Sequence, residues 1–473
     1  MTLFDNSRIF GLMQQYNPWW QTGAVGETLP TVRRQAYADL LHTVADSEYR
    51  RFAVLSGARR VGKTTVMKQV IAELLGRGVP PTNILYLSFD NPIVKLCGME
   101  QVLATYDEMI PHTGLYYFFF DEIQYADNWS LWVKTLYDTR ADLRLAATGS
   151  ASPAIEKGAS DSGVGRWRTF RMPTLTFREY CAIAGVSVHG LDGLSLEKLL
   201  AMQETEFKKA MLMLSGLTPH WNRYLMLGGF PELVHGTRMD EAQRILREDV
   251  VDKVLKRDVP ALFEVRNSSQ LEKIFLYLCL NTSGIINYSG ISGVMEGVSK
   301  PTVVRYIDYL RDANLLYLSP SLGGGAKGKL GGQPKAYIAD AALRNACLMI
   351  NNPTANETDL GIMVETAVYK HFFTAYGTSA HVGYLRTTGK DKEVDVVVEL
   401  PSLERILCEV KYRHGSPVGA QDAIMALSSA PHTKAAIIAT KDAQDFSITT
   451  TQEGAKVFRI PAPALCYILG VNS

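Results

Sequence analysis

One short segment limits what this chain can fold into more than any other feature. SGARRVGKTT, from Ser56 to Thr65, has the spacing GxxxxGK[ST]; it follows an apolar run and precedes a helical pattern from Val66 to Leu75. Gly57 and Gly62 allow the backbone to turn so that its N–H groups converge, and the start of a helix beyond them favours an anion. A chance glycine turn is the alternative, and this context disfavours it. The segment predicts a phosphate-binding loop between a strand and a helix.

The residue types in the loop predict its ligand. Lys63 would reach the β- and γ-phosphates of a nucleotide and assist the reaction there, and the Thr64 hydroxyl would bind Mg²⁺. The other positions offer backbone N–H groups to the phosphates. We therefore expect ATP and Mg²⁺ as cofactors, held by Gly57, Ala58, Arg59, Arg60, Val61, Gly62, Lys63, Thr64 and Thr65.

Four apolar runs in the first half of the chain alternate with helical stretches, as the strands of a parallel sheet do. Their nearly continuous apolarity is typical of strands that are covered on both faces. The fold class is therefore predicted to be α/β, with a parallel sheet around the loop. The expected strands are Phe52 to Leu55, Ile84 to Phe89, Leu115 to Phe120 and Leu143 to Ala147.

Polar side chains follow the third and fourth strands, at the edge of the sheet where ligands bind. Asp121 would hold the hydrated Mg²⁺, and Glu122 would polarise the attacking water. After the fourth strand, the hydroxyl of Thr148 or Ser150 would contact the γ-phosphate; a helix cap is the alternative.

Phosphoryl transfer also requires positive charge against the transition state, often an arginine from a neighbouring subunit. Arg166, which follows the fourth strand, is the first candidate, and Arg168 is the second. A solvated surface arginine is the alternative for both positions.

Composition excludes several classes of protein. The 473 residues are too many for one core and predict two to four domains. Six scattered cysteines without a CxxC pair argue against a disulfide framework and against a zinc site. The net charge of +1 does not by itself predict a nucleic-acid partner. The sequence has no membrane-spanning apolar run and no signal-peptide pattern at its start, so we expect a cytoplasmic protein without a membrane partner.

With these residues in view, the chain resembles a family of bacterial and archaeal ATP-binding proteins that join an AAA-type ATPase to a C-terminal domain formerly of unknown function. The resemblance covers almost the whole chain. It implies an AAA core, a helical lid, a winged helix and a C-terminal domain like restriction endonucleases; it also implies a homo-oligomeric ring with ATP between subunits. The motifs that carry it are NPWW, GARRVGKTT, FFFDEIQYADNW, ATGSAS, TFREY, GGFPE and KAYIAD.

The resulting division of the chain has five parts. We expect Trp19 and Trp20 of NPWW to pack at a domain or subunit interface rather than to stack on a base. The glycine-rich stretch from Ser321 to Pro334 is either a flexible linker or the hairpin wing of the helices before it. The expected parts are 1–50 with NPWW, 51–180 as the ATPase core, 181–240 as the lid, 241–334 as the winged-helix module and 335–473 as the nuclease-like domain.

Gly284 to Pro320 has the pattern helix, turn, helix. Ser299 would cap the second helix, and Pro301 would lie in its first turn. A winged helix places its second helix in the major groove of DNA; a module used only for protein packing is the alternative. We expect the DNA-facing side chains to be Lys300, Thr302, Arg305 and Tyr306.

A second cluster of charged residues appears late in the chain. Glu365 lies on an expected helix, Asp395 on an expected strand, and Glu409 and Lys411 on the next strand, a pattern that resembles the PD-(D/E)XK nucleases. Residues two apart on a strand share a face, so Glu409 and Lys411 would project together. Asp395, Glu409 and Glu365 would bind Mg²⁺ or Mn²⁺, while Glu409 and Lys411 take part in catalysis. A fold retained only for binding is the alternative, and the proline of the motif's name is absent.

Three functions remain open at this point. The first is a Mg²⁺-dependent ATPase that acts on DNA, branched DNA included, and cuts it with the C-terminal site. The second is a DNA motor that remodels or moves branched junctions without cutting. The third is a STAND-type switch, in which the nucleotide controls a protein partner.

Overall fold

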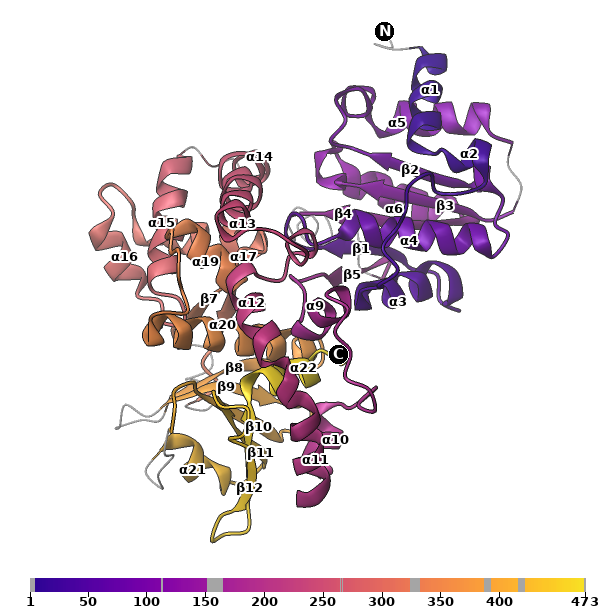
Figure 1. The fold of residues 1–473 in the computed structure, drawn as a ribbon. Coiled ribbons are helices and arrows are strands. Elements are labelled where there is room, and N and C mark those ends of the chain that lie inside the picture. The colour runs from indigo at the N-terminus through magenta and orange to yellow at the C-terminus, as the bar shows by residue number, and fades with distance from the viewer. Residues whose placement is uncertain are drawn as a thin grey trace. The chain divides into compact units, whose positions relative to one another are not determined.

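The computed structural model describes residues 5–111, 114–150, 165–263, 265, 267–323, 332–386, 393–415 and 422–471. The chain divides into two compact units (Figure 1). The first unit comprises Met1–Met172, Asp258–Glu264 and Asp312–Asn314. The second comprises Pro173–Arg257, Val265–Arg311 and Leu315–Ser473. Within the described ranges, no helix is both long enough and apolar enough to cross a membrane.

The first unit is built on a five-stranded parallel sheet with the order β2-β3-β4-β1-β5. The predicted α/β class and its four strands are confirmed. The fifth strand was not predicted, because it lies at the edge of the sheet and only Trp167 and Phe170 are buried, so its sequence lacks an apolar run. The strands are β1 Phe52–Ser56, β2 Ile84–Ser88, β3 Tyr116–Asp121, β4 Leu143–Gly149 and β5 Trp167–Arg171.

Helices pack around this sheet (Figure 1). Helix α1 contacts α5 and strand β2, and helix α3 contacts α4. Helix α4 begins at Lys63, three residues before the predicted start, so the phosphate loop runs directly into its first turn. The helices of this unit are α1 Asn6–Tyr16, α2 Trp19–Thr22, α3 Gln35–Leu41, α4 Lys63–Gly76, α5 Pro92–Met109, α6 Trp129–Thr139 and α14 Val259–Phe263.

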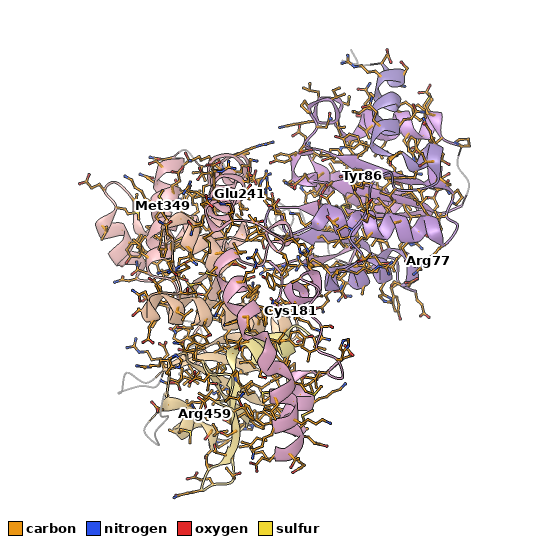
Figure 2. All side chains as sticks on the ribbon, viewed as in Figure 1. Arg77, Tyr86, Cys181, Glu241, Met349 and Arg459 are labelled. Carbon is orange, nitrogen blue, oxygen red and sulfur yellow. The ribbon has the colours of Figure 1, made fainter. Side chains whose placement is uncertain are left out.

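The NPWW motif binds the edge strand β2. The side chain of Asn17 donates to the carbonyl of Tyr86 at 2.9 Å and accepts from its N–H at 2.6 Å, as a neighbouring strand would. The indole N–H groups of Trp19 and Trp20 donate to the carbonyl of Ile84 at 3.0 and 2.8 Å. The expected role at an interface is therefore corrected: these tryptophans cover a sheet edge inside one unit. Figure 2 labels Tyr86 within this sheet.

The second unit contains a mixed six-stranded sheet with the order β12-β13-β11-β10-β9-β8. Strands β10, β11 and β13 pair in parallel, and the other neighbours pair antiparallel. The strands are β8 His381–Arg386, β9 Glu393–Glu399, β10 Arg405–Lys411, β11 Thr433–Thr440, β12 Ser447–Thr450 and β13 Lys456–Pro461. The unit also has an antiparallel pair, β6 Leu316–Ser319 and β7 Lys335–Ile338.

One continuous core joins the predicted lid to the C-terminal sheet. Phe207 of α11 packs against Phe458 of β13 with ring centroids 5.9 Å apart, and Trp221 of α12 lies in the same core. Residues 175–234 therefore bury their apolar side chains against the C-terminal domain. The helices are α9 Phe177–Ile183, α10 Leu196–Ala201, α11 Glu204–Leu214, α12 Thr218–Leu227, α13 Met239–Ile245, α15 Ser268–Leu280, α16 Tyr288–Val294, α17 Lys300–Asp312, α19 Ala341–Cys347, α20 Glu357–Tyr376, α21 Ala423–Ser428 and α22 Ala462–Leu469.

The predicted helix-turn-helix corresponds to α16 and α17. Strands β6 and β7 pair as expected for the hairpin alternative. Residues 324–331 of the glycine-rich stretch lie outside the described residues. Ser299 caps α17 as expected, accepting from the N–H of Thr302 at 3.4 Å. The predicted exposure of Tyr306 is wrong. It is buried, while Val304 is exposed, because positions 303, 306, 307 and 310 form the inward face of the helix. Lys300 and Arg305 are exposed and Thr302 is half-buried.

Candidate nucleotide site and candidate metal centre

The phosphate loop requires glycine at two positions. Gly62 has a φ of 94°, in the left-handed region that favours glycine. A Cβ on Gly57 would lie 2.2 Å from the carbonyl oxygen of Met172, so any side chain there would displace the backbone. Arg60, which lies between these two glycines, also has a positive φ of 62°. The loop is therefore held in a tight turn at the carboxyl end of β1.

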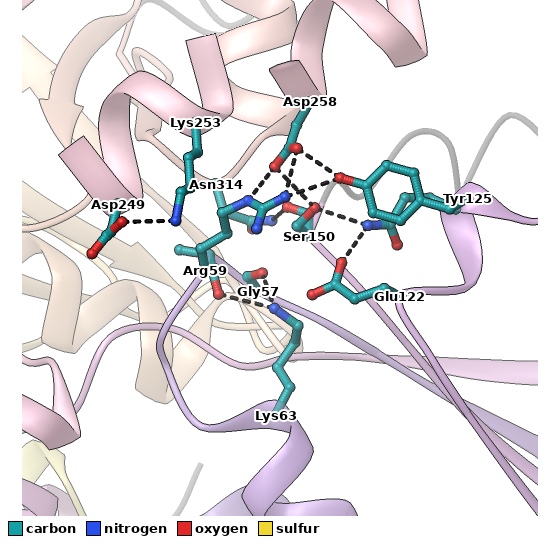
Figure 3. Close-up of polar contacts among 12 residues, drawn as sticks. Gly57, Arg59, Lys63, Glu122, Tyr125, Ser150, Asp249, Lys253, Asp258 and Asn314 are labelled. Atoms are coloured by element: carbon teal, nitrogen blue, oxygen red, sulfur yellow. Dashed lines mark hydrogen bonds and ion pairs between the residues drawn. The ribbon is translucent and has the colours of Figure 1, made fainter. Parts of the chain in front are cut away.

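Lys63 lies inside the loop that it serves. Its ammonium group is buried and donates to the carbonyls of Gly57 at 2.8 Å and Ala58 at 3.0 Å (Figure 3). Burial lowers the pKa of Lys63, while Glu122 and Asp121 oppose this effect by favouring the charged form. A buried cation whose hydrogen bonds go to two loop carbonyls fits an anionic ligand, and this arrangement agrees with the phosphates expected here.

The predicted Mg²⁺ ligands are in direct contact. The Thr64 hydroxyl donates to Asp121 Oδ2 at 2.7 Å, and the hydroxyl of Tyr86 donates to the same oxygen at 2.8 Å. Thr148 donates to Asp121 Oδ1 and accepts from the N–H of Glu122 at 3.0 Å. A hydroxyl beside a carboxylate at the start of a helix is a donor set that fits Mg²⁺. Thr148 thus orients both predicted acidic residues.

Glu122 has an unusual backbone for its residue type. Its φ of 51° and ψ of 45° place it in the left-handed region, which is sparsely populated for residues other than glycine. Such conformations cluster at functional sites. Its carboxylate accepts from the amide of Gln124, and that amide also donates to the Ser150 hydroxyl at 3.1 Å. Gln124 therefore joins the ends of β3 and β4.

The residue that the sequence did not indicate is Asp258. The guanidinium group of Arg59 donates to both of its oxygens, from Nε at 2.5 Å and from Nη2 at 2.7 Å (Figure 3). The Tyr125 hydroxyl donates to Asp258 at 2.9 Å, and the Ser150 hydroxyl lies 3.5 Å away. Burial alone would lower the pKa of Arg59, but the hydrogen bonds to Asp258 raise it. Arg59 and Asp258 are 199 positions apart, so no local pattern connects them.

Arg166 lies away from this network. It donates to both carboxylate oxygens of Asp138, at 2.8 and 3.1 Å, and its carbonyl accepts from the N–H of Phe52. Phe52 begins β1, so Arg166 lies at the amino edge of the parallel sheet, opposite the loop. It cannot serve the site of its own chain, and a role in the site of a neighbouring copy stays a prediction.

The predicted metal centre contains a lysine that the sequence did not indicate. Lys335 of β7 is buried, with 4% of its side chain exposed, and pairs with Glu393, with Glu365 at 3.4 Å and with Asp395 at 3.8 Å. Burial raises the pKa of Glu365 to about 7, and Asp395 adds to this effect. Glu365 also accepts from the Tyr337 hydroxyl at 2.9 Å. Glu365 is therefore a partner of Lys335 and Tyr337, and this geometry does not support its predicted role as a ligand.

Asp395 and Glu409 lie on the paired strands β9 and β10, as predicted. Asp395 accepts from the N–H of Val410 at 2.9 Å, and Lys411 pairs with Glu409 Oε1 at 2.5 Å. Burial raises the pKa of both carboxyl groups. The other oxygen of Glu409 is buried and has no hydrogen-bond partner among the described residues.

The donor set fits a metal ion only in part. Over the described ranges, no group of three or more His, Cys, Asp or Glu side chains is arranged to hold an ion. The predicted set of three carboxylates is therefore not assembled, because the ammonium group of Lys335 lies among them. Asp395 and the unpaired oxygen of Glu409 fit Mg²⁺, which keeps several waters and takes one or two carboxylates.

Comparison with protein families divides the chain in three. A model of an AAA domain matches residues 49–181. Two models described as domains of unknown function, DUF8612 and DUF4143, match residues 218–354 and 360–463. The AAA match covers the loop, Asp121, Glu122 and Thr148, whereas the carboxylates of the second unit fall in families with no stated function.

Relatives and solved structures give similar results. The chain is 25% identical over 320 residues to an uncharacterised protein of Haemophilus influenzae, covering 66% of this chain and 72% of that protein. It is 25% identical over 377 residues to an uncharacterised protein of Methanocaldococcus jannaschii, covering 77% and 76%. The ORC1 protein of Aeropyrum pernix in complex with DNA (13% identity, TM-score 0.30) and its ORC2 protein in ADPNP-ADP complexes (11%, 0.36) each match 70% of this chain and 96% and 98% of theirs. These TM-scores carry no conclusion about function. The family match and the parallel sheet show that this chain carries an AAA domain over residues 49–181.

Proposed function

We propose that the protein is a Mg²⁺-dependent ATPase that acts on DNA and cuts it with the carboxylates of its second unit. The observation that carries the ATPase part is the contact of Thr64 with Asp121 beside the buried Lys63. These three side chains are the ones that nucleotide hydrolysis on a phosphate loop requires. The cutting part is supported by Asp395, Glu409 and Lys411, which lie together on neighbouring strands.

Each step of hydrolysis has a residue to perform it. The loop N–H groups and Lys63 bind the phosphates, while Thr64 and Asp121 would hold Mg²⁺, which neutralises charge on the β- and γ-phosphate oxygens. Glu122 accepts a hydrogen bond from the attacking water and orients it. Thr148 holds the side chain of Asp121 and the backbone of Glu122 in their relative positions.

In the second unit, Asp395 and Glu409 would hold Mg²⁺ or Mn²⁺, which lowers the pKa of a bound water. Lys411 orients the water or stabilises charge on the phosphate. Lys300, Thr302 and Arg305 of α17 would contact DNA, and Tyr306 is withdrawn from that set because it is buried. A homo-oligomeric ring also belongs to this proposal, and light scattering with and without ATP measures it.

A non-cutting DNA motor is the second candidate, and one observation favours it. Lys335 pairs with Glu365, Glu393 and Asp395, so a built-in cation already neutralises part of the carboxylate charge that a metal would balance. Without a metal ion, a site of this kind has nothing to lower the pKa of a bound water and would leave DNA intact.

A gel assay distinguishes the two. End-labelled linear, single-stranded and four-way-junction DNA is incubated with Mg²⁺ or Mn²⁺, with and without ATP, and run on native and denaturing gels. The proteins are wild type, Lys63→Ala, Lys411→Ala and, as a matched control, Lys456→Ala, which removes an exposed lysine from β13 of the same sheet. We expect cuts that disappear in Lys411→Ala and remain in Lys456→Ala. Loss of the cuts in Lys63→Ala as well would show that cutting depends on ATP.

Intact strands that are shifted or exchanged, in a manner that depends on Lys63, would replace the cutting enzyme by the motor. If no DNA is bound or changed, both DNA functions fail and the nucleotide switch remains. ATP hydrolysis measured in parallel tests the first unit separately, because its site does not depend on the carboxylates of the second.

A further inference from the structure

Asp258 is a buried carboxylate inside a site that is built to receive an anion. Only 2% of its side chain is exposed, and it contacts one residue from each of three segments of the nucleotide site. Arg59 belongs to the phosphate loop, Tyr125 follows β3, and Ser150 follows β4. In Figure 3 these three side chains converge on Asp258.

The pairing with Asp258 uses one of the two edges at which the guanidinium group of Arg59 offers paired donors. Nε and Nη2 both donate to Asp258, the paired geometry in which arginine also binds phosphate. Arg59 stands between Gly57 and Gly62 in the loop that would wrap the phosphates. Asp258 and a terminal phosphate are therefore two anions that require the same donor, and two unshielded anions repel each other at short range.

We propose that Asp258 holds Arg59 until a terminal phosphate replaces it, so that the nucleotide site distinguishes a triphosphate from a diphosphate through this exchange. Asp258 is thus a positioning residue that acts through Arg59. The inference rests on the ATP-binding part of the proposed function and is independent of DNA. A diphosphate places no charge at the γ position, so it leaves the Arg59–Asp258 pair intact.

The same network connects the exchange to Glu122. The Ser150 hydroxyl lies 3.5 Å from Asp258 and accepts from the amide of Gln124 at 3.1 Å, and that amide also donates to the carboxylate of Glu122. When Asp258 moves from Arg59, Ser150 loses its charged acceptor and the position of Gln124 changes with it. Binding of a triphosphate would then release Glu122 toward the attacking water.

Equilibrium binding tests the exchange. Isothermal titration of the full chain with ADP and with a non-hydrolysable ATP analogue, both with Mg²⁺, gives the ratio of the two affinities. Asp258→Asn keeps the shape of the side chain and removes its charge. We expect the ratio to shift toward the ATP analogue by about tenfold, within the usual range for coupling between sites. Arg59→Gln should weaken binding of the ATP analogue more than binding of ADP, and it should abolish the effect of Asp258→Asn in the double variant.

Asp107→Asn is the matched control, because it removes another Arg–Asp ion pair of the same unit, with Arg140, outside the loop. Its affinity ratio should equal that of wild type. If Asp258→Asn changes both affinities equally, or neither, Asp258 only anchors its own segment and the inference is wrong. If neither nucleotide binds wild type, the ATP-binding proposal itself fails, which is a different result.

Removing a partner from a buried ion pair can unfold a protein, so wild type provides a second measurement. Hydrogen exchange of the peptide that spans residues 255–263 is compared in the ADP and ATP-analogue complexes. Exchange should be faster with the ATP analogue, because the anchor of α14 is released. Equal or slower exchange would contradict the inference without any variant.

Discussion

At the scale of single residues, hydrogen-bond partners decide between roles that the sequence alone could not separate. Thr148 had two interpretations, a contact to the γ-phosphate and a helix cap. It is fully buried and bonds to Asp121 and to the N–H of Glu122. Its hydroxyl therefore holds in place both the predicted metal ligand Asp121 and the proposed catalytic residue Glu122.

Thr148→Val should lower the rate of ATP hydrolysis by about 10- to 100-fold, the usual cost of losing a group that orients a metal ligand. Valine has the same shape but leaves the N–H of Glu122 without its acceptor. Thr148→Ser keeps the hydroxyl and should retain most of the activity. Steady-state kinetics with varied ATP and Mg²⁺ measures both variants, and equal rates for the two would contradict this role.

Lys335 is a buried cation that balances the charge of three neighbouring carboxylates. Lys335→Met removes the cation from Glu365, Glu393 and Asp395. Breaking a buried ion pair in this way costs about 3–5 kcal/mol, and we expect a loss of that size in the free energy of unfolding at pH 8. At pH 5, Glu365 is protonated, since its pKa is raised to about 7, so the loss should be smaller. Urea unfolding at both pH values measures it.

At the scale of elements, two motifs that had no assigned chemistry, KAYIAD and GGFPE, meet in one buried junction. Asp340, from KAYIAD, accepts from Lys370 at 3.0 Å, from Thr174 at 2.8 Å and from the N–H of Gly229, in GGFPE, at 3.1 Å. Burial would raise the pKa of Asp340, but Lys370 lowers it below the ordinary value. A Cβ on Gly228 would lie 2.6 Å from Asp340, which requires glycine there. These motifs are structural: they join the start of α9 to α19 and α20.

His371 belongs to this junction and predicts a pH dependence. Its Nε2 accepts from the N–H of Phe177 at 2.8 Å, and its Nδ1 bonds to the carbonyl of Ala367, so the ring is neutral. Burial lowers the pKa of His371 to about 3. Between pH 6.5 and 3, the unfolded chain therefore binds a proton that the folded chain does not. As the pH decreases through this range, the free energy of unfolding decreases by about 1.4 kcal/mol per pH unit.

His371→Gln should be less stable than wild type at pH 7.5 but should lose less stability as the pH falls to 5. The difference between the two slopes isolates this histidine from the other titrating groups. Chemical unfolding at pH 7.5, 6 and 5 measures it, and parallel slopes would show that the ring is protonated in the folded protein.

At the scale of the whole molecule, the sequence predicts what depends on neighbours in the chain. Four of the five strands of the first unit were predicted because they are covered on both faces, and the loop was predicted because its spacing is fixed. Partners that lie far apart in the chain were not predictable. The Arg59–Asp258 pair joins positions 199 apart. Lys335 pairs with Glu365 from strand β7, whose sequence gives no sign of a charged partner on a distant helix. The sequence of residues 175–234 has the pattern of any helical module, so it does not reveal which core these helices join.

That shared core predicts how the chain can be divided. A fragment of residues 335–473, cut at the predicted boundary, loses Phe207 and Trp221 from the core of the C-terminal sheet and loses Thr174 and Gly229 from the junction at Asp340. Exposed apolar surface and a buried carboxylate without its donors should leave it aggregated or without fixed side-chain packing.

A fragment of residues 173–473 keeps all of these contacts and should fold. Near-ultraviolet circular dichroism and a cooperative thermal transition measure both fragments under the same conditions. If residues 335–473 fold alone as stably as the longer fragment, the helices of residues 175–234 are not part of that core in solution, and their predicted place as a lid over the nucleotide becomes the better assignment.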